Sequence, residues 1–275
     1  MFLTDYHIHS SCSDDGHNTM LEMALASYSK GVKTLCFTDH CDIDHFMTGE
    51  PNPSCYSHRD DMIQMYAEAR DKVPSDMKVF LGMELGEGNH DPQRAITIAA
   101  SPELDFVLGS VHNLKGTPDF YDMKFHDEVF CRKLIDDYMD ELIELSLVDC
   151  FDVMAHIGYP VRYARKAGFN VEINTQSYGE KLAQVLRNLI ERGKGIEINC
   201  SGFRNPLVGG SMPSVDVLKL YRDLGGEIIT VGSDAHEVGH ACLGLAEGFD
   251  ILRDLGYKYV TVFEKRKPSF IEISK

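Results

Sequence analysis

Short apolar runs alternate with longer amphipathic stretches along the whole chain. The apolar runs have the length of buried strands, whereas the stretches between them place apolar residues three or four positions apart, as helices that cover a sheet do. Strands and helices that alternate in this way form βαβ units with parallel strands. We expect strands at 2–9, 34–38, 79–83, 106–109, 151–155, 195–199, 228–231 and 259–262.

Capping signals and glycines place helices between these strands. Thr19 and Glu22 have the spacing of a capping box, Gly31 can end the helix that they open, and Ser57 can cap the next helix. Seven or so strand–helix units in one run indicate a closed or nearly closed barrel. Because no linker rich in Pro, Gly or Ser interrupts the run, we expect one domain over residues 1–275. The later helices are expected at 127–146, 177–192, 213–225 and 240–255.

The composition is that of a globular protein, and its charge argues against some partners. Of the 275 residues, 43% are hydrophobic and 25% are charged, and the formal net charge is −16 at pH 7. So acidic a surface repels nucleic acid phosphates unless a basic patch compensates. We expect the one short basic run, Lys265-Arg266-Lys267, to be a solvated end of the chain. We therefore expect no nucleic acid partner, and the oligomeric state stays open.

Targeting signals and cysteine spacing point to a reduced compartment. No run of about 18 apolar residues predicts a membrane span, and no basic segment followed by an apolar one predicts a secretory signal. The eight cysteines include no C-x-x-C pair, so a zinc ribbon is not indicated. We expect a cytoplasmic protein without membrane partners, with reduced thiols and with Cys36 and Cys200 as small core residues.

Polar side chains of metal-binding type follow almost every apolar run. In a parallel α/β barrel such positions all lie on the C-terminal face, where active sites are built. Alternate residues of a strand share a face, so His7 and His9 can reach one metal ion. The polar residues at these positions are His7, His9, Asp14, Asp15, Asp39, His40, Glu84, His112, His156, Asn199, Ser201, Arg204, Asp234 and His236.

This set is larger than a single metal site can use. Neutral imidazoles and carboxylates are ligands for Zn, Mn and Fe, and one tetrahedral site takes only about four of them. We therefore expect two to three divalent transition-metal ions. Sites with several metals suit phosphoester hydrolysis, because one ion activates water and the pair stabilises the attacking and leaving oxygens.

Other features of the chain argue against other enzyme classes. The chain has no G-x-G-x-x-G after a strand, no P-loop and no G-x-S-x-G. The sequence therefore does not indicate a nucleotide-cofactor enzyme or a serine hydrolase. The segment 41–57, which contains two prolines, is the longest loop and a candidate lid over the site. We expect solvated side chains for the remaining histidines, which are His17, His45, His58, His90, His126 and His240.

Six motifs of the chain follow one another in a recognisable order. They are Asp5-Tyr6-His7-Ile8-His9, Asp39-His40, Glu84, Gly109-Ser110-Val111-His112, Ala155-His156 and Gly232-Ser233-Asp234-Ala235-His236. Together they resemble the motifs of the PHP (polymerase and histidinol phosphatase) superfamily, and the resemblance runs from Asp5 to about Leu255. The segment 197–204, Glu-Ile-Asn-Cys-Ser-Gly-Phe-Arg, is similar to one in the histidinol-phosphatase branch.

The resemblance implies a distorted (β/α)7, TIM-like barrel with a trinuclear metal site at the C-terminal ends of its strands. The first ion would be held by His7, His9, Glu84 and Asp234. Glu84 would bridge to a second ion, which is completed by His112 and His156. The third would take His40, His236 and a residue of the first loop. Many members have a histidine at that last position, and here the spacing offers Asp15, with Asp14 as the alternative.

The resemblance also implies a reaction, the hydrolysis of L-histidinol phosphate to L-histidinol and phosphate in histidine biosynthesis. A hydroxide that bridges two ions would attack the phosphorus atom. Arg204 offers a bidentate fork for the phosphate oxygens, and Arg162 is a further phosphate candidate. A water on the third ion, or Asp234 or His236, could protonate the leaving oxygen, and the sequence does not decide among them.

An aromatic wall and a carboxylate would match the imidazole and ammonium groups of this substrate. Phe120, Tyr121 and the loop around Phe46 could supply them, and the sequence does not rank these residues. Tyr159-Pro160 departs from the acidic pair expected after this histidine in the branch.

Two other functions fit part of the pattern. A PHP phosphoesterase could act instead on a nucleotide or another small phosphate ester, although the net charge of −16 argues against long nucleic acid. A metal-storing or metal-sensing protein would explain the ligands but not Arg204 beside them. The small-molecule phosphomonoesterase is the function that accounts for both.

Overall fold

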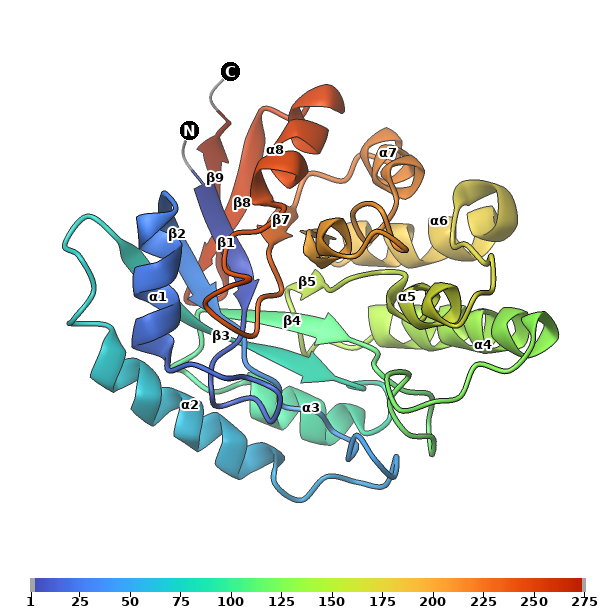
Figure 1. Cartoon of the computed structure of the whole chain (residues 1–275), viewed down its shortest axis with the longest axis horizontal. Coiled ribbons are helices and arrows are strands. Elements are labelled where there is room, and N and C mark those ends of the chain that lie inside the picture. Colours follow the sequence, from blue (N-terminus) through green and yellow to red (C-terminus); the bar gives the residue numbers. More distant parts are fainter. Residues whose placement is uncertain (1–2, 274–275) are drawn as a thin grey trace.

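Seven parallel strands lie side by side in chain order and curve into a nearly closed barrel (Figure 1). The computed structural model describes residues 3–273. Strands that follow one another in the sequence are neighbours in the sheet, as consecutive βαβ units require. The expected distorted (β/α)7 barrel is thereby confirmed. Its strands are β1 (Leu3–Ile8), β2 (Val32–Phe37), β3 (Lys78–Gly86), β4 (Phe106–Ser110), β5 (Val153–Met154), β6 (Gly195–Asn199) and β7 (Ile229–Gly232).

The seam of the barrel lies between β1 and β7. Just beyond the end of β7, the backbone N–H of Asp234 donates to the carbonyl of His7, over 2.7 Å. The buried Asp5 carboxylate accepts hydrogen bonds from the backbone N–H of Ser233 at 2.9 Å and from its hydroxyl at 2.6 Å. The seam therefore brings the first and the last of the candidate ligand segments together.

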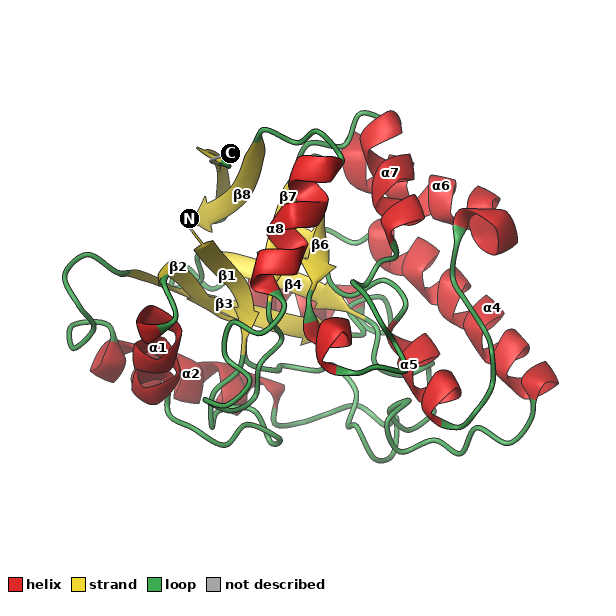
Figure 2. Ribbon diagram, turned by 45° about the horizontal axis from the view of Figure 1, so that its top comes forward, coloured by secondary structure: helices red, strands yellow, loops and turns green. Residues whose placement is uncertain are grey.

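Helices connect the strands and surround the sheet (Figure 2). The expected capping box is present, because the Thr19 side chain accepts the N–H of Glu22 and the Glu22 side chain bonds back. No helix in residues 3–273 is both long and apolar enough to cross a membrane. The helices are α1 (Met20–Ser29), α2 (Cys55–Ala69), α3 (Pro92–Ala99), α4 (Glu128–Ser146), α5 (Tyr159–Lys166), α6 (Thr175–Glu191), α7 (Val215–Asp223) and α8 (Leu245–Asp254), with a 3-10 turn η1 (Ser201–Arg204).

Some boundaries differ from those expected. Helix α2 begins at Cys55 rather than after Ser57. Helix α8 begins only at Leu245, because Gly244 before it has a φ of 84°, a left-handed conformation that cannot continue a helix. The sequence analysis missed α3, although Asp91 caps it and a proline occupies its first turn.

An antiparallel hairpin, β8 (Tyr259–Glu264) and β9 (Lys267–Glu272), follows the barrel. The Tyr6 hydroxyl of β1 donates to the carbonyl of Phe263, over 2.9 Å, and Val262 and Phe263 pack in one apolar cluster with side chains of β1, β4 and β5. Lys265 and Arg266 both have positive φ and form the turn of the hairpin. Arg266 also pairs with the Asp152 carboxylate, so the expectation of a solvated basic end is wrong for this residue.

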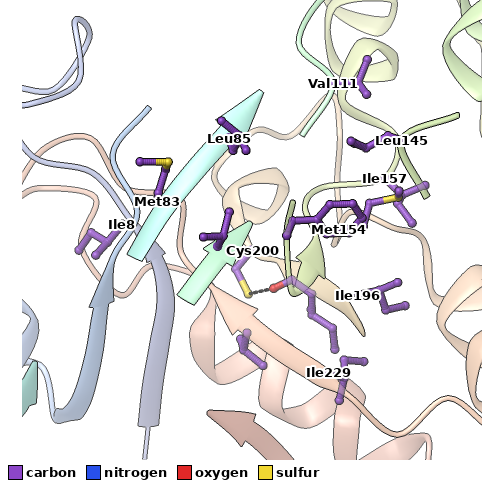
Figure 3. Close-up of a cluster of buried hydrophobic side chains, with 14 of the residues drawn as sticks. Ile8, Met83, Leu85, Val111, Leu145, Met154, Ile157, Ile196, Cys200 and Ile229 are labelled. Atoms are coloured by element: carbon purple, nitrogen blue, oxygen red, sulfur yellow. Dashed lines mark hydrogen bonds between the residues drawn. The ribbon is translucent and has the colours of Figure 1, made fainter. Parts of the chain in front are cut away.

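The main core lies between the sheet and the helices that cover it (Figure 3). Side chains such as Ile8, Leu85 and Ile196 from the strands share this cluster with Leu145 of α4. Cys200 is fully buried among them and Cys36 is fully buried in the smaller cluster, as the sequence predicts. Close packing of this layer fixes the strand ends from which the functional side chains project.

Candidate metal centre

Histidines from four strand ends surround the Glu84 carboxylate on the C-terminal side of the barrel. One oxygen, Oε2, lies 3.1 Å from Nε2 of His7 and 3.2 Å from Nδ1 of His40. The other, Oε1, lies 3.1 Å from Nε2 of His112 and 2.7 Å from Nε2 of His156. A buried carboxylate with imidazoles on both oxygens has the arrangement of a ligand that bridges two ions.

Asp234 and His9 complete the group on the Oε2 side of Glu84. The Oδ1 atom of Asp234 lies 3.8 Å from Nε2 of His7 and 3.6 Å from Nε2 of His9. The two imidazole nitrogens are 3.1 Å apart. The alternation of β1 thus places both rings on one face, as the sequence predicts.

A third group lies at the outer edge, where His40 and His236 face the first loop. Nε2 of His236 lies 3.1 Å from Oδ2 of Asp15, and Nε2 of His40 lies 3.8 Å from its Oδ1. Asp14 lines the same cavity but is not ion-paired to either histidine in residues 3–273. The geometry therefore favours Asp15 over Asp14 for the residue from this loop.

The nitrogen and oxygen atoms of this cluster are arranged as metal ligands rather than as hydrogen-bond partners of one another. Nδ1 of His40 and Nε2 of His236 are buried, and within the described chain neither has a hydrogen-bond partner, although each faces a carboxylate oxygen. Four groups have ligand atoms that all lie within 4.8 Å of one another. Three consist of predicted ligands, namely His7, His9 and Glu84; His40, Glu84 and His112; and His9, His40 and His236. The fourth is Asp42, Glu87 and His112. Imidazole with carboxylate is the donor set of Zn, Mn and Fe sites.

The charges of His9, Glu84 and Asp234 suit the same role, whereas, against the effect of burial, nearby carboxylates raise the pKa of His7 and of His112. Burial lowers the pKa of His9, and its neighbours His236 and His40 lower it further, so this imidazole is held neutral with a free lone pair. Burial alone would raise the pKa of the Glu84 carboxyl, but the surrounding histidines hold it well below its usual range. Asp234 shows the same balance: burial would raise the pKa of its carboxyl, but His7, His9 and His236 together hold it well below its usual range. Neutral imidazoles and ionised carboxylates are the forms that bind metals.

Glu197 supports the centre from behind, and sequence reasoning missed this role. Its Oε1 atom lies 2.7 Å from Nδ1 of His7, and its Oε2 atom accepts the backbone N–H of His156 at 3.0 Å. A carboxylate on Nδ1 fixes the tautomer that leaves the Nε2 lone pair free for a metal. The signal in the sequence was one acidic residue inside the otherwise apolar run 195–198.

Two polar residues at strand ends hold loops instead of facing the centre. Asp39 accepts hydrogen bonds from the hydroxyls of Ser10 and Ser13, at 2.8 and 2.7 Å, and so shapes the first loop. The Asn199 amide donates to Asp234 at 3.2 Å, and its oxygen accepts the Ser201 hydroxyl at 2.6 Å.

A cavity of about 570 Å³ opens above the centre. Asp42, Asp44, Phe46 and Asn52 of the segment 41–57 line it, which is where a lid would lie. Cys41 and Cys55, whose Cα atoms are 5.1 Å apart, form a disulfide across the ends of this segment. The expectation of reduced thiols throughout does not hold for this pair, because the loop brings its two ends within bonding reach.

Arg204 and Arg162 reach the same cavity from separate elements. The Arg204 guanidinium donates to the carbonyls of Ser233 and Asp234, the latter at 2.8 Å. The Arg162 guanidinium donates to the Ser201 hydroxyl at 3.0 Å. Both cations are thus held in place beside the candidate metal ligands.

Two expectations about side chains near the site are wrong. His90 is not solvated: it is buried between Asp44 and Glu141, with nitrogen–oxygen distances of 2.6 and 2.9 Å. Phe120 is fully buried and packs against Tyr138, so it cannot form a substrate wall, whereas Tyr121 and Phe46 do line the cavity. A single residue cannot reveal its tertiary partners from sequence, and both errors have this cause.

Comparison with known proteins gives concordant matches. The family model described as PHP domain matches residues 5–201. A probable histidinol-phosphatase of Clostridium acetobutylicum is 28% identical over 95% of this chain and 97% of its own length. The histidinol-phosphatase of Lactococcus lactis is 25% identical over 96% and 95%.

A solved structure has the same fold over nearly its full length. It is a histidinol phosphate phosphatase from Lactococcus lactis complexed with Zn, L-histidinol and phosphate. Its TM-score is 0.74 at 22% identity, and the match covers 97% of this chain and 98% of the other.

Proposed function

The chain belongs to the PHP domain family, and from that membership we propose that it is a metal-dependent phosphomonoesterase that hydrolyses L-histidinol phosphate to L-histidinol and phosphate. The observation that carries the proposal is the juxtaposition of two guanidinium groups with a centre of imidazoles and carboxylates in one cavity. Two curated relatives named histidinol-phosphatase or probable histidinol-phosphatase align with this chain over nearly its whole length, which supports the choice of substrate.

We assign the ligands in three groups, of which the first two share Glu84. Two to three divalent ions, such as Zn or Mn, would lower the pKa of a bound water and neutralise phosphate charge when present. The first group is His7, His9, Glu84 and Asp234. The second shares Glu84 and adds His112 and His156. The third is His40, His236 and Asp15.

The residues of the chain around this centre bind and orient the phosphate. The carbonyls of Ser233 and Asp234 hold the Arg204 guanidinium at the cavity, and Ser201 holds that of Arg162. Two fixed cations can take the non-bridging phosphate oxygens and stabilise their charge as the ester bond breaks. The low pKa of Asp234 keeps this carboxyl ionised, so it is suited to ligation rather than to donating the proton that the leaving oxygen requires.

The test is phosphate release by purified protein of known metal content. The substrates are L-histidinol phosphate, a nucleotide monophosphate and an aryl phosphate. We expect a strong preference for L-histidinol phosphate that is lost on chelation and restored by Mn²⁺ or Zn²⁺. Chelator-sensitive activity confined to the other two esters would contradict the biosynthetic role, and tight metal binding without any hydrolysis would indicate metal storage.

A further inference from the structure

The cavity above the metal centre carries charges of both signs. Its cationic residues, Arg162, Lys166 and Arg204, come from the segments that follow β5 and β6. Its acidic residues outside the ligand groups include Asp119 and Asp122, from the loop that follows β4. A phosphate needs only the cations, so the carboxylates call for a second group on the substrate.

Asp119 is held rigidly where it lines the cavity. Its backbone N–H donates to the carbonyl of Phe46 in the lid segment, over 2.7 Å, and its own carbonyl accepts the N–H of Asp122 at 2.9 Å. Its Oδ1 atom accepts the backbone N–H of Tyr121 at 2.7 Å. These bonds fix the carboxylate and leave Oδ2 free to accept from a ligand.

Within residues 3–273 no lysine, arginine or histidine forms an ion pair with this carboxylate, and His112 and His40 act on it only through space. Burial raises the pKa of Asp119 to about 6, and the histidines of the centre offset this only in part. A half-buried carboxylate without a cationic partner is costly for the free protein, and a cationic ligand would relieve that cost.

Aromatic rings line the cavity together with this carboxylate. Tyr121, Tyr159 and Tyr163 line the same cavity, and the ring centroids of Tyr121 and Tyr163 are 5.9 Å apart. The Tyr163 hydroxyl donates to that of Tyr159 at 2.8 Å. Burial, and next the charge of Asp119, raise the pKa of Tyr159. A carboxylate next to aromatic faces is the recognition chemistry of an organic nitrogen cation.

We propose that Asp119 is the specificity-determining residue that binds the nitrogen cation of the substrate, its ammonium or protonated imidazole, while Arg162 and Arg204 take the phosphate. This assignment rests on the proposed phosphatase function. It assigns recognition of the cation to the loop after β4 rather than to the metal centre.

The first experiment measures binding, so that it does not depend on turnover. L-histidinol and inorganic phosphate are titrated calorimetrically into metal-loaded wild type, Asp119→Asn and Asp254→Asn. Asparagine keeps the oxygen that accepts from Tyr121, so the variant should fold, which thermal melting verifies. Asp254→Asn removes the same charge from an exposed position at the end of α8, outside the cavity. We expect Asp119→Asn to weaken L-histidinol binding by about 10- to 100-fold, the effect of losing a hydrogen bond between charged groups, and phosphate binding to stay unchanged.

Kinetics then separate this proposal from the proposed function. In Asp119→Asn, kcat/KM should fall for L-histidinol phosphate and for O-phosphoethanolamine, which carries only an ammonium, but not for a neutral aryl phosphate. A fall in kcat/KM for L-histidinol phosphate alone would identify the imidazole as the group that Asp119 binds. Equal losses of kcat/KM for all esters, no loss for any, or the same effect in Asp254→Asn would overturn the assignment. If wild type ignores L-histidinol phosphate but prefers O-phosphoethanolamine through Asp119, the proposed function fails and this inference stands.

Discussion

Glu197 acts on the metal centre without facing the cavity. It bonds to Nδ1 of His7 and to the backbone of His156, and so it links one ligand from each side of Glu84. Replacing it with an amide keeps its shape but removes the charge that holds the His7 proton on Nδ1. Partners of this kind typically contribute 10- to 100-fold to metal affinity.

We therefore expect Glu197→Gln to bind Zn²⁺ about 10- to 100-fold more weakly than wild type, as measured by competition with a chromophoric chelator. Glu191→Gln, at the end of α6, serves as the matched control and should bind as wild type does. An unchanged affinity in Glu197→Gln would mean that His7 is oriented by packing alone.

Arg204 gives a second prediction at this scale. Arg204→Ala removes a fixed cation from the cavity, and kcat/KM for L-histidinol phosphate should fall about 100-fold, the effect of losing charge-assisted bonds to phosphate. The exposed Arg187→Ala on α6 removes the same charge away from the site and should have no effect. Because Arg204 also bonds to two carbonyls, a melting curve of each variant must show that it is folded. Full activity in a folded Arg204→Ala would mean that Arg204 does not bind the phosphate.

The roles of some single residues could be predicted from the sequence, and the roles of others could not. The ligand-type side chains at strand ends stand out because each follows an apolar run, and the structure brings His7, His9, His40, Glu84, His112, His156, Asp234 and His236 together. Glu197 and His90 were missed because their roles depend on partners 190 and 46 residues away. No local pattern encodes such pairings.

At the scale of elements, His90 bonds both to the candidate lid segment 41–57 and to α4. Burial opposes its charged form, but hydrogen bonds to Asp44 of the lid and Glu141 of the helix raise the pKa of His90 to about 9 from the usual 6.5. The folded state thus binds the proton more tightly than the unfolded chain. This contribution to stability is complete below about pH 6.5 and is lost as the pH rises through 9.

The free energy of unfolding should accordingly fall between pH 6.5 and 9, by about 1–2 kcal/mol after allowance for solvent screening. Urea titrations across this range would measure it, and His90→Gln should flatten the dependence while lowering stability at pH 6. The exposed His240→Gln should retain the wild-type slope. A slope that persists in His90→Gln would assign the titration to another group.

Elements with strong local signals were predicted, and those that depend on tertiary context were not. The strand 195–199 matches its expected bounds, and α4 begins directly after its cap, Asp127. Strand β5 keeps only two residues of the five expected, because pairing with its neighbours rather than apolar character sets its length. The pairing of β8 with β9 was missed, because the Lys265-Arg266 turn has positive φ without glycine.

At the scale of the whole molecule, metal binding should stabilise the fold. The centre joins segments from six strand ends, and the metal-free protein holds buried carboxylates and imidazoles side by side. Ions present at 100 to 1,000 times their Kd would add about 2.7–4 kcal/mol. Calorimetric melting with and without chelator should show a lower Tm on metal removal, reversed by Zn²⁺ or Mn²⁺. A Tm insensitive to chelation would argue against resident ions.

The barrel itself could be predicted from the sequence, because seven alternations of strand and helix leave few other arrangements. The packing of β8 against Tyr6 could not be predicted, because an apolar strand after the last helix has the same pattern as one more barrel strand. The alternation of elements encodes the topology, whereas the way the barrel is filled depends on which side chains meet inside it.

The seam between β1 and β7 has a consequence for biosynthesis. The bonds that Ser233 donates to Asp5 join residues 228 positions apart, so the barrel can close only after its last strand has been made. At about 5–20 residues per second on the ribosome, His7 and His9 would emerge some ten seconds or more before Asp234. During that interval the nascent chain exposes chelating side chains before the folded site that selects among metals has formed. Correct metallation is therefore a property of the finished chain, and fragments released early would be promiscuous metal binders.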